Sequence, residues 1–240
     1  MAICTVCGAW LEPSALDFSS NPNAIVCPNC GHRERLIRHP LWFIAGSSGS
    51  GKSTLMPYLR RALPECVVFE GEAIDFWRYG DSPTGYAALH NQWLKVAHQI
   101  ALGERPVVFV AIAYPQQLAA CPFHHYFSPL HFLGLTCSEQ AQRERLLARP
   151  AWRNAGSPEF IAQSYGFTRG LEALARAGNT GIALHDTTAL TPADSATAIA
   201  GWVRQTLSPN VTLHYARIVG LDLAEAHATA DPARSLKTRG

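Results

Sequence analysis

The sequence has no long apolar run and no strong excess of charge of either sign. No stretch approaches the roughly 20 apolar residues that a helical membrane span needs. Residues 1–7 lack the basic region and apolar core of a signal peptide. A formal net charge of +2 over 240 residues argues against nucleic acid or an anionic membrane as the main partner. We therefore expect a cytoplasmic protein; the sequence gives no indication of its oligomeric state.

Apolar residues are abundant and their arrangement predicts the fold class. Hydrophobic residues make up 48% of the chain and charged residues 16%, which suits one ordinary domain with a small appendage. Short apolar segments predict strands at 41–45, 67–69, 106–113, 131–136 and 181–184. Helices are predicted at 52–63, 86–102, 138–148, 158–177 and 192–207. The alternation predicts an α/β three-layer sandwich with a mainly parallel, five-stranded sheet.

The composition changes along the chain and divides it into three parts. Residues 1–38 are rich in cysteine, serine, asparagine and proline and read as a separate module. Residues 39–207 contain the alternating strands and helices, and residues 208–240 show no clear periodicity. We expect the last part to be an extension or a tail.

Four of the seven cysteines form two Cys-x-x-Cys-Gly units in the first part. Nineteen residues, 8–26, separate the units, within the spacing of four-cysteine zinc sites. Four thiolates complete a tetrahedral shell, so the expected zinc is structural. A redox dithiol and an iron site are the alternatives. The module resembles a zinc ribbon, and zinc ribbons also bind nucleic acid or protein partners. The expected zinc ligands are Cys4, Cys7, Cys27 and Cys30.

Residues 46–53 match the phosphate-loop pattern G-x-x-x-x-G-K-[ST] at every fixed position. Glycines allow backbone N–H groups to approach phosphate oxygens, and the helix that follows directs its positive end at the same anion. Lys52 is expected to reach the terminal phosphates of ATP, and the Ser53 hydroxyl to ligate Mg²⁺. The expected nucleotide-binding residues are Gly46, Ser47, Ser48, Gly49, Ser50, Gly51, Lys52, Ser53 and Thr54.

Two further groups of charged residues accompany the loop. Glu70 and Glu72 follow the second predicted strand, and Arg149 and Arg153 lie at and beyond the end of a predicted helix. With the phosphate loop, these features make residues 41–207 resemble the P-loop kinases of small molecules. That group comprises the nucleoside and nucleotide kinases and the gluconate, shikimate and adenylylsulfate kinases.

The resemblance implies a set of catalytic residues. Glu70 corresponds to the acid that activates the acceptor hydroxyl or helps to hold Mg²⁺, and Glu72 is its neighbour. Because the group often has Asp-x-Asp at this place, the division of roles between the two glutamates stays open. Arg149 and Arg153 correspond to a lid that closes over the phosphoryl group, whereas Arg143 or Arg145 is expected only to complement the helix dipole. The implied catalytic set is Lys52, Glu70, Glu72, Arg149 and Arg153.

The third predicted strand ends without an acidic residue, which argues against motor-type ATPases and favours a kinase. Aromatic faces near the second strand could stack on a base. A nucleoside or nucleotide is therefore the leading acceptor. The residues behind this expectation are Phe76, Trp77, Arg78, Tyr79 and Tyr86, with Asp75 as a further acid. The loop 184–188 corresponds to the segment beside the adenine, although a capped turn explains it equally well.

The leading hypothesis is therefore an ATP-dependent kinase that transfers the γ-phosphate to a hydroxyl or phosphate of a small molecule. Two other classes stay open. One is a nucleic-acid-end kinase or nucleic-acid-associated NTPase that binds its polymer through the ribbon. The other is a non-catalytic nucleotide-binding module that docks a protein partner.

Overall fold

A computed structural model describes residues 2–12, 16, 24–74, 79, 82–178 and 181–207 of the protein. Its centre is a five-stranded sheet with the strand order β6-β7-β5-β8-β9, in which every neighbouring pair runs parallel. The strands are β5 (His39–Gly46), β6 (Val67–Glu70), β7 (Val107–Ala111), β8 (Phe127–Thr136) and β9 (Ile182–Asp186). The predicted parallel α/β sheet is thus confirmed, with strand boundaries that differ by a few residues.

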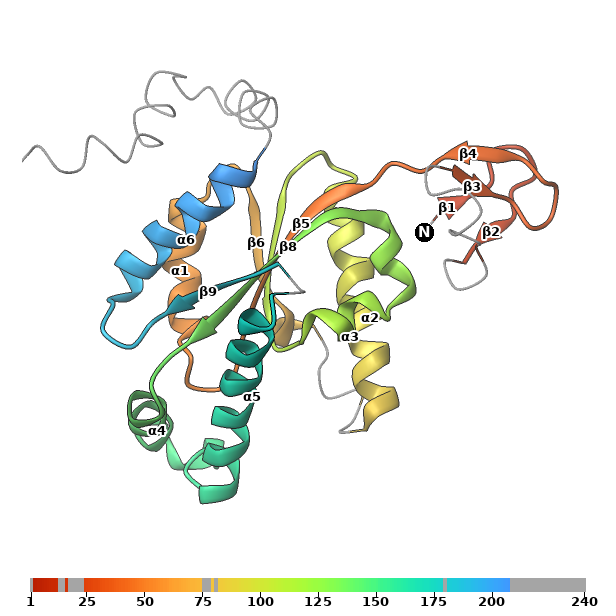
Figure 1. Ribbon diagram of the computed structural model, residues 1–240. Coiled ribbons are helices and arrows are strands. Elements are labelled where there is room, and N and C mark those ends of the chain that lie inside the picture. Colours follow the sequence, from red (N-terminus) through yellow and green to blue (C-terminus); the bar gives the residue numbers. More distant parts are fainter. Residues whose placement is uncertain are drawn as a thin grey trace, which may run out of the picture.

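Helices cover both faces of the sheet (Figure 1). Helices α1 and α6 pack together on one face, and α2, α3 and α5 lie on the other. The α-helices are α1 (Lys52–Ala62), α2 (Pro83–Ala101), α3 (Pro115–Ala119), α4 (Glu139–Leu147), α5 (Pro158–Arg176) and α6 (Pro192–Thr206). Short 3₁₀ segments are η2 (Gly71–Ala73), η4 (Pro122–Tyr126) and η5 (Ala151–Arg153).

The central strand β5 divides the apolar core between the two faces. Side chains alternate along a strand, so Leu41 and Phe43 enter the cluster under α2, while Trp42 and Ile44 enter the cluster under α1 and α6. All four side chains are completely buried. A strand that is buried on both faces must be apolar throughout, which is why its sequence shows a continuous apolar run rather than an alternating one.

Side-chain caps fix where several helices begin. Ser138, Ser157 and Thr191 each accept a hydrogen bond from the backbone N–H three residues later. The helix predicted at 138–148 therefore begins at Glu139, with Ser138 as its cap. Ser82 caps α2 in the same way, which starts this helix at Pro83 rather than at residue 86.

The segment between β7 and β8 differs from the prediction. Sequence periodicity indicated no element there, but α3 and η4 occupy residues 115–126. Each is five residues long and begins at a proline, Pro115 or Pro122, so neither has enough turns to show a helical period. Strand β8 also starts earlier than predicted, at Phe127.

The N-terminal part forms two small antiparallel sheets, β1 (Ala2–Ile3) with β2 (Trp10–Leu11) and β3 (Ala24–Val26) with β4 (Arg33–Arg35). It joins the amino end of β5 (Figure 1). Ile25 and Leu36 belong to the same buried cluster as Tyr126 and Phe127, so its apolar residues continue the main core. The boundary at residue 38 stays a prediction, and the predicted extension at 208–240 lies outside the described residues. No helix in the described ranges is long and apolar enough to cross a membrane.

Gly71 follows the edge strand β6 and lies between Glu70 and Glu72, so its packing helps to position both glutamates. A Cβ on Gly71 would lie 2.8 Å from a Phe109 ring carbon and 2.9 Å from both Ala111 Cβ and the Trp93 ring. We expect Gly71→Ala to lower the free energy of unfolding by about 1–3 kcal/mol because these buried groups must shift. Urea denaturation monitored by circular dichroism measures the change.

Gly201→Ala is the matched control. Gly201 lies within helix α6, and a Cβ there meets nothing within 4 Å. This variant should gain about 0.5–1 kcal/mol from improved helix propensity. Equal stability of the two variants would contradict the close packing described for Gly71.

Candidate functional site

The predicted phosphate loop connects the carboxyl end of β5 to the first residue of α1. Gly49 and Gly51 have φ values of +83° and +100°, in the region that residues with a side chain rarely adopt. These two glycines therefore let the chain turn sharply from the strand into the helix. The turn directs the N-terminus of α1 at the space enclosed by the loop, where an anion is favoured.

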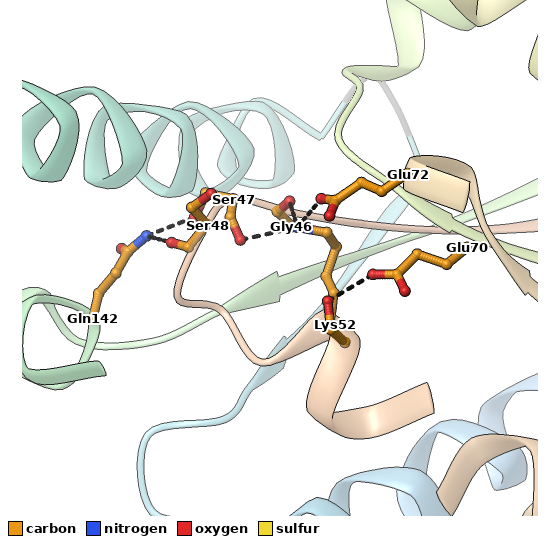
Figure 2. A network of polar contacts seen from close by, with 8 residues as sticks. Gly46, Ser47, Ser48, Lys52, Glu70, Glu72 and Gln142 are labelled. Atoms are coloured by element: carbon orange, nitrogen blue, oxygen red, sulfur yellow. Dashed lines mark hydrogen bonds and ion pairs between the residues drawn. The ribbon is translucent and has the colours of Figure 1, made fainter. Parts of the chain in front are cut away.

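Lys52 holds the inner side of the loop (Figure 2). Its Nζ atom donates hydrogen bonds to the carbonyl oxygens of Gly46 and Ser47, at 2.8 and 3.1 Å. The side chain is only 5% exposed, and the Glu72 carboxylate lies 3.8 Å from Nζ. The ammonium group thus has two backbone acceptors in the loop and one acidic neighbour, Glu72, which lies in η2.

Side chains from other elements hold the outer side of the loop. Gln142 on α4 donates to Ser48 O at 2.6 Å, and Arg145 on the same helix donates to Gly49 O at 3.4 Å. The Thr187 hydroxyl, directly after β9, lies 3.1 Å from Ser50 O. Every carbonyl oxygen from 46 to 50 therefore has a side-chain donor within hydrogen-bond distance.

This arrangement of the carbonyl oxygens orients the N–H groups of the loop. A planar trans peptide points its C=O and the following N–H in opposite directions. Because Ser48 O and Ser50 O point outward to Gln142 and Thr187, the N–H groups of Gly49 and Gly51 point to the other side. Backbone N–H groups that converge in this way form an anion-binding nest.

Gln142 and Thr187 were not identified from the sequence. Arg145 was expected only to complement the helix dipole, but it also donates to Thr187 O at 2.7 Å and to the Thr187 hydroxyl at 2.9 Å. The loop 184–188, placed beside the adenine by resemblance, thus supplies a support of the phosphate loop. From the sequence one could expect only that the buried carbonyl groups of the loop have hydrogen-bond donors. The spacing of residues along the chain does not indicate which side chains provide them.

Most of the residues predicted for the site line a single pocket. It includes most of the phosphate loop, one of the two predicted acids and both predicted lid arginines. Arg153 stacks on the indole ring of Trp152, which is 78% exposed, with 5.1 Å between the guanidinium carbon and the ring centroid. The lining residues are Ser47, Ser48, Gly49, Gly51, Lys52, Ser53, Thr54, Glu72, Arg149 and Arg153.

The cations of the pocket repel one another. Burial lowers the pKa of Lys52, the carboxylates of Glu72 and Glu70 oppose the shift, and the charge of Arg149 adds to it. The pKa of Arg149 is also lowered, first by burial and then by Arg153. A polyanion in the pocket, such as a nucleoside triphosphate, would relieve this repulsion.

Glu70 lies beside the predicted magnesium ligand. The Ser53 hydroxyl donates a hydrogen bond of 2.7 Å to a Glu70 carboxylate oxygen. An octahedral Mg²⁺ with oxygen ligands at about 2.1 Å has neighbouring ligands about 3.0 Å apart. The two oxygens therefore fit adjacent positions of one magnesium ion. Glu70 itself is not among the pocket-lining residues, whereas Glu72 is.

The four predicted zinc ligands come together in the N-terminal part. Their sulfur atoms all lie within 4.8 Å of one another, with Cys4 and Cys30 at 3.6 Å and Cys7 and Cys27 at 3.7 Å. A tetrahedral zinc with Zn–S bonds of about 2.3 Å has sulfur atoms about 3.8 Å apart. The cluster therefore has the geometry of a four-thiolate metal site.

The two Cys-x-x-Cys units have the same backbone conformation. In each, the glycine after the second cysteine donates to the carbonyl of the first, at 2.9 Å. Gly8 and Gly31 have φ values of +71° and +73°. The glycine that follows each pair is thus required by the turn that brings the two sulfurs together.

The predicted acceptor-binding residues are only partly described. Asp75, Phe76, Trp77 and Arg78 lie outside the described residues. Tyr79 packs against the main core. Tyr86, on α2, is partly buried, and its ring lies 6.3 Å from that of His90. The structure therefore does not bring these two tyrosines into the pocket lining.

Comparison with known proteins identifies the fold. No protein-family model and no curated protein matches the sequence. An unliganded sugar kinase from a Janibacter species superposes with a TM-score of 0.56 at 13% identity, over 72% of this chain and 98% of that chain. The tunicamycin resistance protein of Deinococcus radiodurans gives 0.51 at 22% identity, over 72% and 99%. The chain thus has the fold of these proteins, which spans about seven-tenths of its length.

Lys52→Met tests the anion-binding role of the loop. We expect this variant to bind ATP more weakly by about 1.5–3 kcal/mol, roughly ten- to hundredfold in Kd, because a charged hydrogen-bond donor is lost. Isothermal titration calorimetry with MgATP measures the change. Lys95→Met on α2, outside the pocket lining, is the matched control and should bind as the unmodified protein does. Equal affinities would rule out the phosphate site.

Proposed function

We propose that the protein is an ATP-dependent kinase that transfers the γ-phosphate of ATP to a small-molecule acceptor. The observation that carries this proposal is the convergence of three groups on one pocket: the phosphate loop, an acid that follows β6, and two arginines from the segment after α4. A hydrolytic or mechanical ATPase has no need of a lid that excludes water, whereas a kinase must protect the phosphoryl group from hydrolysis.

In this proposal each group of residues has a defined role in the reaction. The acceptor oxygen forms a bond to the γ-phosphorus, the bond from that phosphorus to the β–γ bridging oxygen breaks, and ADP leaves. Lys52 and the loop N–H groups hold the β- and γ-phosphates. Arg149 and Arg153 stabilise the charge on the transferring group. Bound magnesium would neutralise phosphate charge, and Ser53 and Glu70 would hold it.

The positions of the two glutamates suggest how their roles divide. Glu70 hydrogen-bonds the proposed magnesium ligand Ser53, so we assign it to the metal. Glu72 lines the pocket and faces Lys52, so we assign it as the base that accepts the acceptor's proton. The resemblance alone favoured Glu70 as the base or metal partner.

The acceptor is proposed to be a nucleoside or nucleotide. This choice depends on Phe76 and Trp77, whose rings could stack on a base, because Tyr79 and Tyr86 pack elsewhere. The name of the superposed sugar kinase makes a sugar the second acceptor class to test.

The experiment is ATP consumption against a panel of nucleosides, nucleotides, sugars and short oligonucleotides. Stimulation by one small acceptor, with its phosphorylated product identified by mass spectrometry, would support the kinase. Stimulation only by oligonucleotides would favour a nucleic-acid enzyme instead. ATP binding without turnover on any acceptor would favour a regulatory module with a protein partner.

Two variants test the assignment of the glutamates. Glu72→Gln should lower kcat by about 10²–10⁴-fold, the usual contribution of a general base, with an unchanged Mg²⁺ requirement. Glu70→Gln should instead raise the Mg²⁺ concentration for half-maximal activity, because a metal ligand is lost. The exposed Glu104, in the turn after α2, provides the control Glu104→Gln. The reverse pattern would exchange the two roles.

We also propose that the N-terminal cysteine cluster binds one structural zinc ion. The cluster lies at the amino end of β5 and the phosphate loop at its carboxyl end. Eight strand residues span about 26 Å, so the zinc would stand far from the chemistry. The small N-terminal sheets bury little apolar surface by themselves, and the metal would supply much of their folding free energy.

Metal analysis of the purified protein tests the zinc site. We expect one zinc per chain, and a loss of most of it in Cys30→Ser, because a three-thiolate site binds more weakly. Cys121→Ser replaces a buried cysteine outside the cluster and should keep the metal. Cobalt substitution should give the intense visible absorption of a tetrahedral thiolate site. Full zinc content in Cys30→Ser would contradict the assignment.

A further inference from the structure

Gln142 is completely buried, and all its side-chain hydrogen bonds involve the phosphate loop or α5. Its Nε2 atom donates to Ser47 Oγ at 2.7 Å and to Ser48 O at 2.6 Å. Its Oε1 atom accepts from the hydroxyl of Thr168 at 3.3 Å. Burial of an uncharged amide is costly unless every group is paired, so this position requires both donors and the acceptor. The proposed reaction does not use this residue.

The three side chains form a closed ring of hydrogen bonds. Gln142 donates to the Ser47 hydroxyl, which lies 3.0 Å from the Thr168 hydroxyl, which in turn donates to Gln142. Because Ser47 Oγ accepts a hydrogen bond from the Gln142 amide, the Ser47 hydroxyl can itself donate a hydrogen bond to Thr168. Each group thus donates once and accepts once within the ring, and such chains strengthen cooperatively in a buried environment. Figure 2 shows the Gln142 and Ser47 side of the ring.

The ring joins the phosphate loop to the two helices that flank the arginine-bearing segment. Residues 148–157 lie between α4, which carries Gln142, and α5, which carries Thr168. This segment contains Arg149 and Arg153 of the pocket. Leu146, Ala155 and Ile161 form a small separate core beneath it. The two helices that flank the segment are therefore both joined to the same serine of the loop, and Ala155 of the segment packs against both helices.

We propose that Gln142 and Thr168 are positioning residues that couple nucleotide in the phosphate loop to the placement of Arg149 and Arg153. A phosphate that orders Ser47 also fixes the two helices from which the arginine segment projects. This inference rests on the proposed nucleotide site, but it requires no particular acceptor. Disruption of the ring at any member should loosen both nucleotide binding and the arginine segment.

A double-mutant cycle between Ser47 and Thr168 tests the ring. Ser47→Ala and Thr168→Val each remove one hydroxyl and keep the approximate side-chain volume. We expect each to weaken MgATP binding about five- to tenfold, the effect of one lost buried hydrogen bond. Because either change already breaks the ring, the double variant should bind within about twofold of the single variants. Additive losses would overturn the ring as a unit.

Two further variants separate positioning from general stability. Thr168→Ser keeps the hydroxyl and should retain the affinity of the unmodified protein. Thr197→Val makes the same change as Thr168→Val on α6, where the threonine hydroxyl donates to Ala193 O, and should leave affinity unchanged. All titrations are made well below each variant's unfolding temperature.

Hydrogen–deuterium exchange of residues 148–157 at saturating ATP measures the coupling directly. In the unmodified protein ATP should slow exchange in this segment, and in Thr168→Val this protection should be lost although the loop is occupied. Equal protection in both proteins would overturn the inference and leave the nucleotide site intact. Absence of ATP binding by the unmodified protein would overturn the proposed function and the inference together.

Discussion

The structure of the site depends on the orientation of five consecutive backbone carbonyl groups. The carbonyls from Gly46 to Ser50 are all within reach of side-chain donors: Lys52 within the loop, and Gln142, Arg145 and Thr187 outside it. Because Ser48 O and Ser50 O are held outward, the N–H groups of Gly49 and Gly51 are available to an anion. A loop of glycine and serine has little conformational preference of its own, so its binding shape must come from these partners.

The parallel sheet explains why the side-chain donors from other elements lie beside the phosphate loop. The carboxyl ends of β5, β8 and β9 lie side by side, so the segments that follow them meet at one edge of the sheet. The loop after β5 is the proposed anion site, the helix after β8 supplies Gln142 and Arg145, and the turn after β9 supplies Thr187. The phosphate loop is thus one of three adjacent connections that support each other.

The sequence was sufficient to predict the succession of most strands and helices along the chain and the position of the phosphate loop, because both depend on local patterns. The apolar run of β5 and the spacing from Gly46 to Ser53 are visible without any tertiary contact. Gln142, Thr168 and Thr187 could not be predicted in this way. Their importance comes from partners up to 137 positions away, as in the contact between Thr187 and Ser50, and nothing in their neighbouring residues marks them. Short elements such as α3 were missed because they contain too few residues for a period.

The contacts of Lys52 bear on which anions the pocket would select. Its ammonium group already gives hydrogen bonds to two loop carbonyls and faces the Glu72 carboxylate. A small anion such as free phosphate or sulfate would have to replace these contacts with only its own few oxygens, and would gain little in exchange. In the proposed function a triphosphate would engage the loop N–H groups and both arginines at once. The contacts that Lys52 makes within the site would then set a threshold that favours nucleotides over abundant simple anions.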